Sequence, residues 1–138
     1  MNKIEFLSQY HRIMLEIEKK QRYIDFCEER SKEPSGPKLD DKPRNPNQAN
    51  EAPFVRWVFK GIEAKEELET LEQKAKSIKL QIERAINTVQ EEELQMILTY
   101  RYIDLLTWKE IAKVLYYSDR SVRRKHEQAL ELIKIDDQ

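Results

Sequence analysis

Small and apolar residues recur at alternating steps of three and four between residues 61 and 89, which is the spacing of a coiled-coil seam. This spacing predicts one long helix of coiled-coil type over residues 54–90. Such a stripe has to be covered by another helix, because helices in proteins gain most of their stability from packing an apolar side. The seam consists of Gly61, Ala64, Leu68, Leu71, Ala75, Ile78, Ile82, Ala85 and Val89.

The first residues of the chain carry a pattern of matching length. It predicts an amphipathic N-terminal helix over residues 1–31. Two arrangements would cover both stripes: an antiparallel hairpin within one chain, or a homodimer through the coiled-coil helix, and the sequence leaves both open. The N-terminal stripe consists of Leu7, Tyr10, Met14, Ile17, Gln21 and Ile24, with Gln21 as its one polar member.

All five prolines lie between Pro34 and Pro53. Proline removes a backbone donor and breaks helices, so residues 32–53 are predicted to be a linker or a long mobile loop. The most apolar cluster of the chain follows directly. We expect its large side chains to be buried in the protein's own core rather than exposed to a partner protein. The cluster consists of Phe54, Val55, Trp57, Val58 and Phe59.

Composition narrows the class of protein. Charged residues make up 37% of the 138 residues and there are only two glycines, a mixture that favours helices over a sheet-rich fold. The formal net charge is −1, so any affinity for nucleic acid has to come from a local cluster of cations. Cys27 is the only cysteine, which excludes a disulfide within the chain and, with no signal peptide evident, favours a reducing cytoplasm. We expect Cys27 to be a half-buried apolar residue.

The last third of the chain predicts a helix-turn-helix. Thr107 is a good N-cap for a short helix that ends near Tyr116, and Ser118 is a second N-cap followed by Asp119 in the first turn. A preceding helix, capped by Thr88 and starting near Glu91, would complete a domain over residues 91–138. The predicted inward stripes are Leu94, Ile97, Leu98, Arg101 and Tyr102, then Trp108, Ile111, Ala112 and Leu115, then Val122, His126, Ala129 and Ile133. The predicted fold is therefore all-α, with a hairpin or coiled-coil arm before this domain.

The second helix of this pair carries a run of cations. If Val122 faces inward, a rotation of about 100° per residue places Arg120 and Arg124 on the opposite side. We predict that Arg120, Ser121 and Arg124 contact base edges in the major groove. Arg123, Lys125 and Lys109 are then expected to contact phosphates, and the helix terminus at Thr107 to abut the DNA backbone.

Residues 94–130 resemble region 4 of sigma-70-type factors, and they are similar to phage-encoded transcriptional regulators of the RinA/ArpU type. The resemblance covers about the last third of the chain. It implies a protein that binds double-stranded DNA at a late phage promoter and acts with host RNA polymerase in the bacterial cytoplasm. Tyr116 departs from the sigma pattern, which often has glycine there, so a differently shaped turn is expected. The residues that carry the resemblance are 94–103 (LQMILTYRYI), 107–112 (TWKEIA), 117–122 (YSDRSV) and 126–130 (HEQAL).

Two other functions fit the same architecture. A phage small terminase subunit would mark DNA for packaging, and a coiled-coil interaction or inhibitor protein would use the basic helix as ordinary surface. An enzyme is not expected, because His11 and His126 are the only histidines and neither has a nucleophile or carboxylate constellation that the sequence can bring to it. No cofactor and no metal site are predicted. His126 is expected to be packed in the core.

Overall fold

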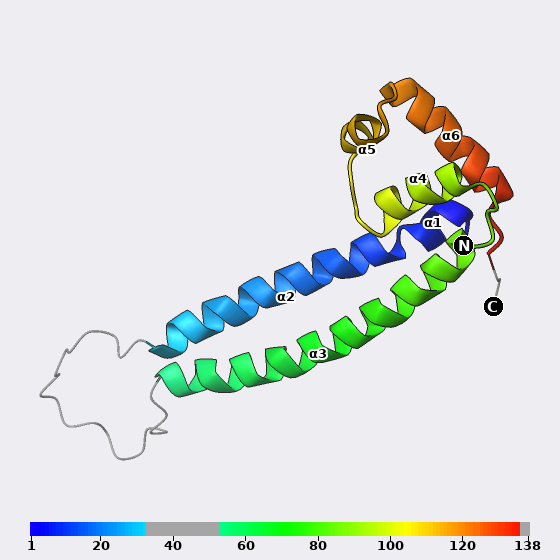
Figure 1. Cartoon of the computed structure of the whole chain (residues 1–138). Coiled ribbons are helices and arrows are strands. Elements are labelled where there is room, and N and C mark those ends of the chain that lie inside the picture. Colours follow the sequence, from blue (N-terminus) through cyan, green and yellow to red (C-terminus); the bar gives the residue numbers. More distant parts are fainter. Residues whose placement is uncertain (33–52, 136–138) are drawn as a thin grey trace, which may run out of the picture. The chain divides into compact units, whose positions relative to one another are not determined.

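The computed structural model describes residues 1–32 and 53–135, and every regular element in these ranges is an α-helix (Figure 1). The prediction of an all-α protein is therefore confirmed for the described residues. Apart from its end residues, Lys32 and Pro53, the predicted linker lies outside them. The helices are α1 (Lys3–Leu7), α2 (Gln9–Lys32), α3 (Pro53–Ile86), α4 (Glu92–Tyr102), α5 (Trp108–Leu115) and α6 (Asp119–Leu132).

The chain forms two compact units. One consists of Glu16–Glu72, which contains most of α2 and the first half of α3. The other consists of Met1–Leu15 and Gln73–Gln138, which contain α1, the start of α2, the end of α3 and helices α4 to α6. We call them the arm unit and the terminal unit.

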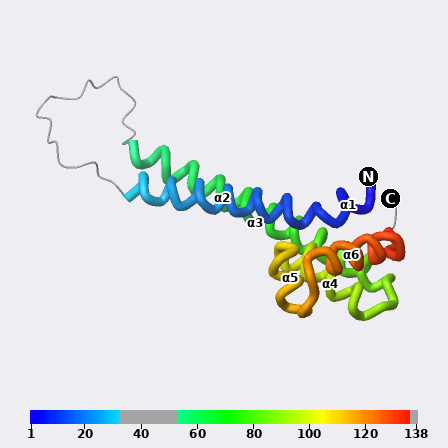
Figure 2. Tube along the Cα trace, turned by 90° about the horizontal axis from the view of Figure 1, so that it is seen from above, coloured from blue at the N-terminus to red at the C-terminus, as the bar shows by residue number. Residues whose placement is uncertain are grey.

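In the arm unit, α2 and α3 lie side by side and antiparallel (Figure 2). Ile24 of α2 is buried against Ala64 and Leu68 of α3. Cys27, which was expected to be half-buried, is fully buried, and a Cβ atom added to Gly61 of α3 would lie 3.4 Å from the Cys27 Cβ. Every residue of the predicted seam is buried or half-buried, so the alternating spacing identified the inward side of this helix correctly. The helix itself ends at Ile86, so Val89 lies beyond it, and it is shorter than predicted.

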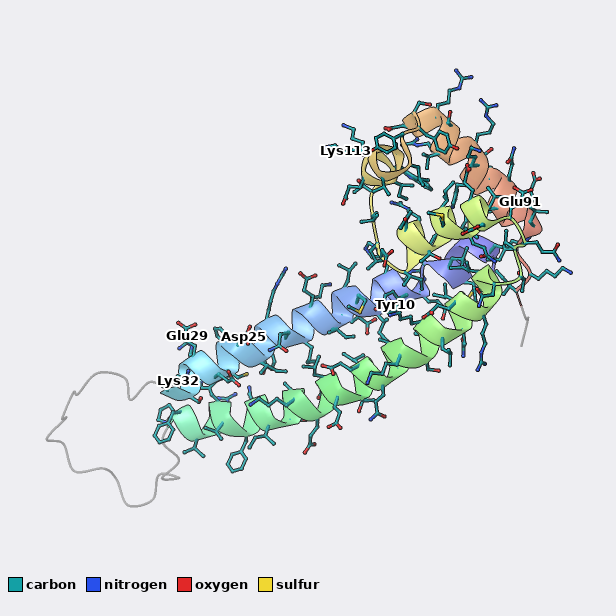
Figure 3. All side chains as sticks on the ribbon, in the orientation of Figure 1. Tyr10, Asp25, Glu29, Lys32, Glu91 and Lys113 are labelled. Carbon is teal, nitrogen blue, oxygen red and sulfur yellow. The ribbon has the colours of Figure 1, made fainter. Side chains whose placement is uncertain are left out.

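The N-terminal stripe differs from the prediction in two places. The single predicted helix is divided at Ser8, where α1 ends and α2 begins. Gln21 is exposed and donates a hydrogen bond to Asp25 (3.0 Å), while Lys20 faces α3 and forms an ion pair with Glu67. The inward position is therefore Lys20 and not Gln21. A long lysine side chain can cover apolar surface and still place its ammonium group beside a carboxylate. Charged residues such as Asp25 and Glu29 point outward from α2 (Figure 3).

The apolar cluster after Pro53 forms the first turns of α3, and the expectation that it is buried in the core is wrong for most of it. Phe54, Val58 and Phe59 are 41%, 40% and 63% exposed. At about 100° per residue they project to the flank and back of the helix, away from the side that meets α2. Trp57 alone turns inward, and its ring meets the edge of Phe26 with the centroids 5.3 Å apart.

The terminal unit has a core to which both ends of the chain contribute. Leu7 of α1 is fully buried together with residues of α3, α4 and α6, and the Lys3 ammonium group donates a hydrogen bond to the Leu130 carbonyl (2.7 Å). This contact of the N-terminus with α6 was not predicted. The buried members of the core are Leu7, Ile82, Ala85, Ile86, Val89, Leu94, Leu98, Tyr102, Ala129 and Ile133.

Thr88 does not cap α4, contrary to the prediction. Its hydroxyl donates to the Ala85 carbonyl (2.6 Å) and accepts from the Lys134 amide (2.9 Å), so it joins the end of α3 to the C-terminal residues. Glu91 takes the N-cap position without a side-chain cap, and Glu92 and Glu93 lie in the first turn. These carboxylates stabilise the helix start through the helix dipole.

Candidate nucleic-acid interface

The start of α5 is fixed by a capping box at Thr107. The Thr107 hydroxyl accepts a hydrogen bond from the Glu110 amide, and the Glu110 carboxylate accepts one from the Thr107 amide, both at 3.2 Å. The predicted N-cap is therefore confirmed, together with a reciprocal partner that the prediction did not include. Thr107 is exposed, and so is Lys109 in the first turn.

The turn between α5 and α6, residues 116–118, keeps the left-handed form in spite of its tyrosine. Tyr116 adopts φ 57° and ψ 41°, and its amide donates to the Ala112 carbonyl. The Tyr117 amide donates to the same carbonyl at 3.0 Å. These two bonds close the end of α5 and offset the cost of about 1 kcal/mol for a bulky left-handed residue. The expectation of a differently shaped turn is wrong for this reason.

Ser118 caps α6, as predicted, because its hydroxyl accepts a hydrogen bond from the Ser121 amide (3.1 Å). The predicted inward stripe of α6 is also confirmed, since Val122 and Ala129 are fully buried and His126 is 8% exposed. Val122 packs against Ile97 of α4 and Ile111 of α5, so α6 is held at one rotation about its axis.

That rotation decides which α6 side chains reach solvent. The guanidinium-bearing residues Arg120, Arg123 and Arg124 are all exposed. Together with Asp119 and Glu127 they line one surface recess on α6. The three arginines therefore gather on the N-terminal half of the helix, while the outward positions farther along it carry Glu127 and Glu131.

Two of the residues predicted to contact DNA have other partners. The Ser121 hydroxyl lies 3.0 Å from the Ser118 hydroxyl and belongs to the cap. The Lys125 ammonium lies 2.6 Å from a Glu93 carboxylate oxygen, and the other oxygen of Glu93 accepts a hydrogen bond from the Tyr117 hydroxyl (3.1 Å). The lysine also lies over the Tyr117 ring, 5.1 Å from its centroid.

The charges in this contact stabilise each other. The close contact with the Lys125 ammonium lowers the pKa of Glu93. Burial opposes this effect, and the hydrogen bond from Tyr117 lowers the pKa further by a smaller amount. The same contact with Glu93 raises the pKa of Lys125. The contact joins α4, the turn and α6. Sequence reasoning missed it, because no local pattern joins a carboxylate in the first turn of α4 to a lysine on α6.

We call the exposed Arg120, Arg123 and Arg124 the basic surface. On the buried side of α6, His126 belongs to a group of aromatic residues. The His126 ring meets Trp108 edge-on with the centroids 4.7 Å apart, and its Nε2 lies 2.6 Å from the Tyr102 hydroxyl in a hydrogen bond. Burial, with a smaller effect of the Arg101 charge, lowers the pKa of His126 to about 4. The histidine is thus packed in the core, as predicted, and neutral at neutral pH.

Arg101 holds the other side of Trp108. Its guanidinium lies over the Trp108 ring at 4.4 Å from the centroid and donates to the Leu106 carbonyl at 3.1 Å. Arg123 approaches the same ring at 5.9 Å. The tryptophan therefore lies between the buried His126 and the exposed Arg123.

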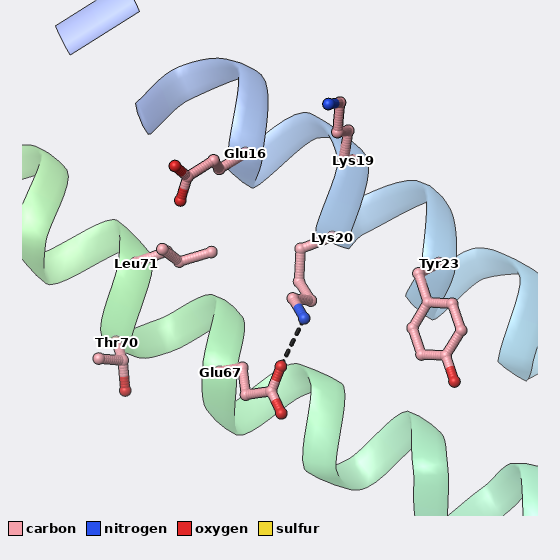
Figure 4. A pocket seen from close by; sticks show the side chains of 7 residues that line it. All are labelled: Glu16, Lys19, Lys20, Tyr23, Glu67, Thr70 and Leu71. Carbon is pink, nitrogen blue, oxygen red and sulfur yellow. Dashed lines mark hydrogen bonds and ion pairs between the residues drawn. The ribbon is translucent and has the colours of Figure 1, made fainter. Parts of the chain in front are cut away.

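A second surface recess lies within the arm unit, between α2 and α3 (Figure 4). The ion pair of Lys20 with Glu67 crosses it, and Tyr23 and Leu71 lie at its sides. Its lining combines these two apolar side chains with one closed ion pair, which is an ordinary surface for two packed helices.

Among the described helices, no stretch combines the length and the apolarity that crossing a membrane requires. Comparison of the chain with protein-family models, with curated protein sequences and with solved structures gives no match in any of the three.

Proposed function

We propose that the chain is a sequence-specific DNA-binding protein in which α5 and α6 act as a helix-turn-helix and α6 enters the major groove. The observation that carries this proposal is the exposure of three arginines on the N-terminal half of α6: Arg120 and Arg124 opposite its buried stripe, and Arg123 on the flank. The N-terminal half of a recognition helix is the part that meets base edges. Arginine is well suited to that position because its planar guanidinium forms two hydrogen bonds to guanine.

The distribution of carboxylates agrees with this orientation. Asp119 occupies the first turn, where the helix dipole stabilises its negative charge. Glu127 and Glu131 lie on the outward side of the later turns. An acidic surface would be repelled by phosphates, so only the first two turns of α6 are suited to approach a duplex. Arg120 and Arg124 are therefore assigned to base edges, and Arg123 and Lys109 to phosphates.

Lys125 is proposed to have a structural role and not a DNA contact. Its ion pair with Glu93 fixes α6 against α4, so it supports the orientation of the basic surface rather than supplying a free charge. Ser121 remains a candidate base contact through its half-exposed side chain, while its amide completes the cap. Thr107 and Lys109 are exposed at the start of α5, and the proposal assigns them to one strand of the DNA backbone.

The biological role proposed is that of a transcriptional regulator at a phage late promoter, acting with host RNA polymerase. The support is the resemblance of residues 94–130 to region 4 of sigma-70-type factors and to regulators of the RinA/ArpU type. Selection of bound fragments from the source genome tests this role. Fragments from a late promoter are expected, whereas fragments from a packaging site would indicate a terminase subunit, and no enrichment would contradict DNA recognition altogether.

One observation favours a second function for the arm unit, a contact with a protein. Phe54, Val58, Phe59 and Ile62 expose 40–63% of their surfaces along the first turns of α3. Exposed clusters of large apolar residues are typical of protein contact sites, so we propose that this surface binds a second copy of the chain. Sedimentation equilibrium tests this proposal: a dimer that Phe59→Ser converts to a monomer is expected, and a monomeric wild type would contradict it.

A further inference from the structure

Tyr116 combines a strained backbone with a side chain that supports nothing in the fold. Its φ is 57°, in the left-handed region, and it is 94% exposed. The neighbouring Tyr117 has a structural use for its side chain, because its hydroxyl donates to Glu93. For Tyr116, the contacts within the described residues include no hydrogen bond of the hydroxyl and no packing of the ring. A left-handed backbone at a residue whose side chain makes no contact in the fold is characteristic of positions that serve a function.

The position of Tyr116 indicates which function. It lies two residues before Ser118, the N-cap of α6, so it stands within about 7 Å of the helix end that carries Arg120. The major groove is about 12 Å wide and is bordered on both sides by phosphates. A turn attached to a helix end inside the groove is therefore brought against one of these borders.

We infer that Tyr116 contacts the DNA backbone: its hydroxyl donates a hydrogen bond to a phosphate oxygen, and its ring packs on the adjoining sugar. This inference depends on the proposed function, since it requires α6 to enter the groove. Tyrosine is one of the residues that contact phosphates in this manner. Unlike arginine or lysine, it carries no charge, so the contact adds affinity without releasing a counterion.

The experiment compares wild type, Tyr116→Asn and Tyr116→Phe. Asparagine is well tolerated in the left-handed region, so the melting temperature of Tyr116→Asn is expected to equal that of wild type or to exceed it by a few degrees. Binding is measured by fluorescence anisotropy on a mixed-sequence duplex of about 30 base pairs at several salt concentrations. We expect Tyr116→Asn to bind about five- to tenfold more weakly and Tyr116→Phe about threefold.

The salt dependence separates this contact from an ionic one. The slope of log affinity against log salt is expected to stay at the wild-type value in both Tyr116 variants, whereas Lys109→Ala should reduce it by about one. Equal binding by wild type and Tyr116→Asn would overturn the inference alone, and is the result expected if Tyr116 meets a protein instead. A melting temperature of Tyr116→Asn well below that of wild type would make the residue structural and would also overturn it. Failure of folded wild type to bind the duplex would instead refute the proposed function.

Discussion

Lys125 of α6 and Glu93 of α4 form an ion pair with 2.6 Å between their charged atoms, and this contact divides the basic run of α6 into two classes of cation. The arginines of the run are exposed, while the lysine is held against the neighbouring helix. The salt dependence of DNA binding should follow this division. Lys125→Ala is expected to leave the salt slope unchanged, and Lys109→Ala to lower it by about one. Equal reductions in both variants would show that Lys125 leaves Glu93 to bind phosphate.

Arg124 is assigned to a base edge, so its loss should depend on the sequence of the DNA. Arg124→Ala is expected to weaken binding to a selected genomic fragment by about ten- to a hundredfold while binding to a scrambled duplex changes much less. Lys76→Ala serves as the matched control, because Lys76 is an exposed cation on α3. An identical loss on both duplexes would move Arg124 to the phosphates.

Ser118 should contribute measurably to stability because it caps α6 through the Ser121 amide. Ser118→Ala is expected to lower the free energy of unfolding by about 1 kcal/mol, as measured by urea denaturation. The exposed Ser77, within α3, provides the control, since Ser77→Ala places a better helix former at a solvent position and should be neutral or slightly stabilising. Similar losses in the two variants would speak against the cap.

His126 makes stability depend on pH in a defined window. Burial lowers its pKa from 6.5 to about 4, so below pH 6.5 the unfolded chain takes up a proton that the folded chain refuses. The contribution of neutral, buried His126 to the free energy of unfolding is fully present above pH 6.5 and is lost as the pH falls toward 4. Between pH 7 and pH 5 the free energy of unfolding should fall by about 2 kcal/mol. In His126→Gln this fall should largely disappear, and an unchanged fall would assign it to other groups.

The N-terminus should be required for the stability of the C-terminal helices. Leu7 is fully buried with Ala129 and Ile133 of the C-terminal residues, so Leu7→Ala is expected to cost about 2–5 kcal/mol. A fragment of residues 91–138 alone lacks Leu7 as well as Ile82 and Ile86, and we expect its circular dichroism to show no cooperative unfolding. A cooperatively folded fragment would show that this contact is dispensable.

Gly61 offers a test of the packing in the arm unit. A Cβ at this position would lie 3.4 Å from the Cys27 Cβ, an ordinary contact distance, so Gly61→Ala should fit without moving α2. Alanine favours the helix, and the variant is expected to gain about 0.5–1 kcal/mol in the free energy of unfolding. Gly61→Leu is the paired variant and should lose stability because its larger side chain has to displace Cys27. A loss in both variants would indicate a closer approach of the helices.

The caps of α5 and α6 and the inward sides of α3 and α6 could be predicted because they depend on residues close together in the sequence. Thr107, Ser118 and the stripe of Val122 follow from local rules of capping and spacing. The contacts that complete the terminal unit could not. Lys3 meets Leu130 across 127 positions of sequence, and Glu93 meets Lys125, and no local pattern indicates which distant partner a surface charge will meet. Tyr116 was misjudged because two backbone hydrogen bonds outweighed its intrinsic preference.

The most direct test of DNA recognition by α6 is an anisotropy titration of a duplex with wild type and with the double variant Arg120→Ala/Arg124→Ala. Both proteins should show the same helical circular dichroism, because both side chains are exposed. Wild type is expected to bind in dilute salt with an affinity that falls steeply as salt rises, and the double variant to bind at least about a hundredfold more weakly to a selected fragment. Folded wild type that ignores the duplex, or a double variant that binds as well as wild type, would contradict the account.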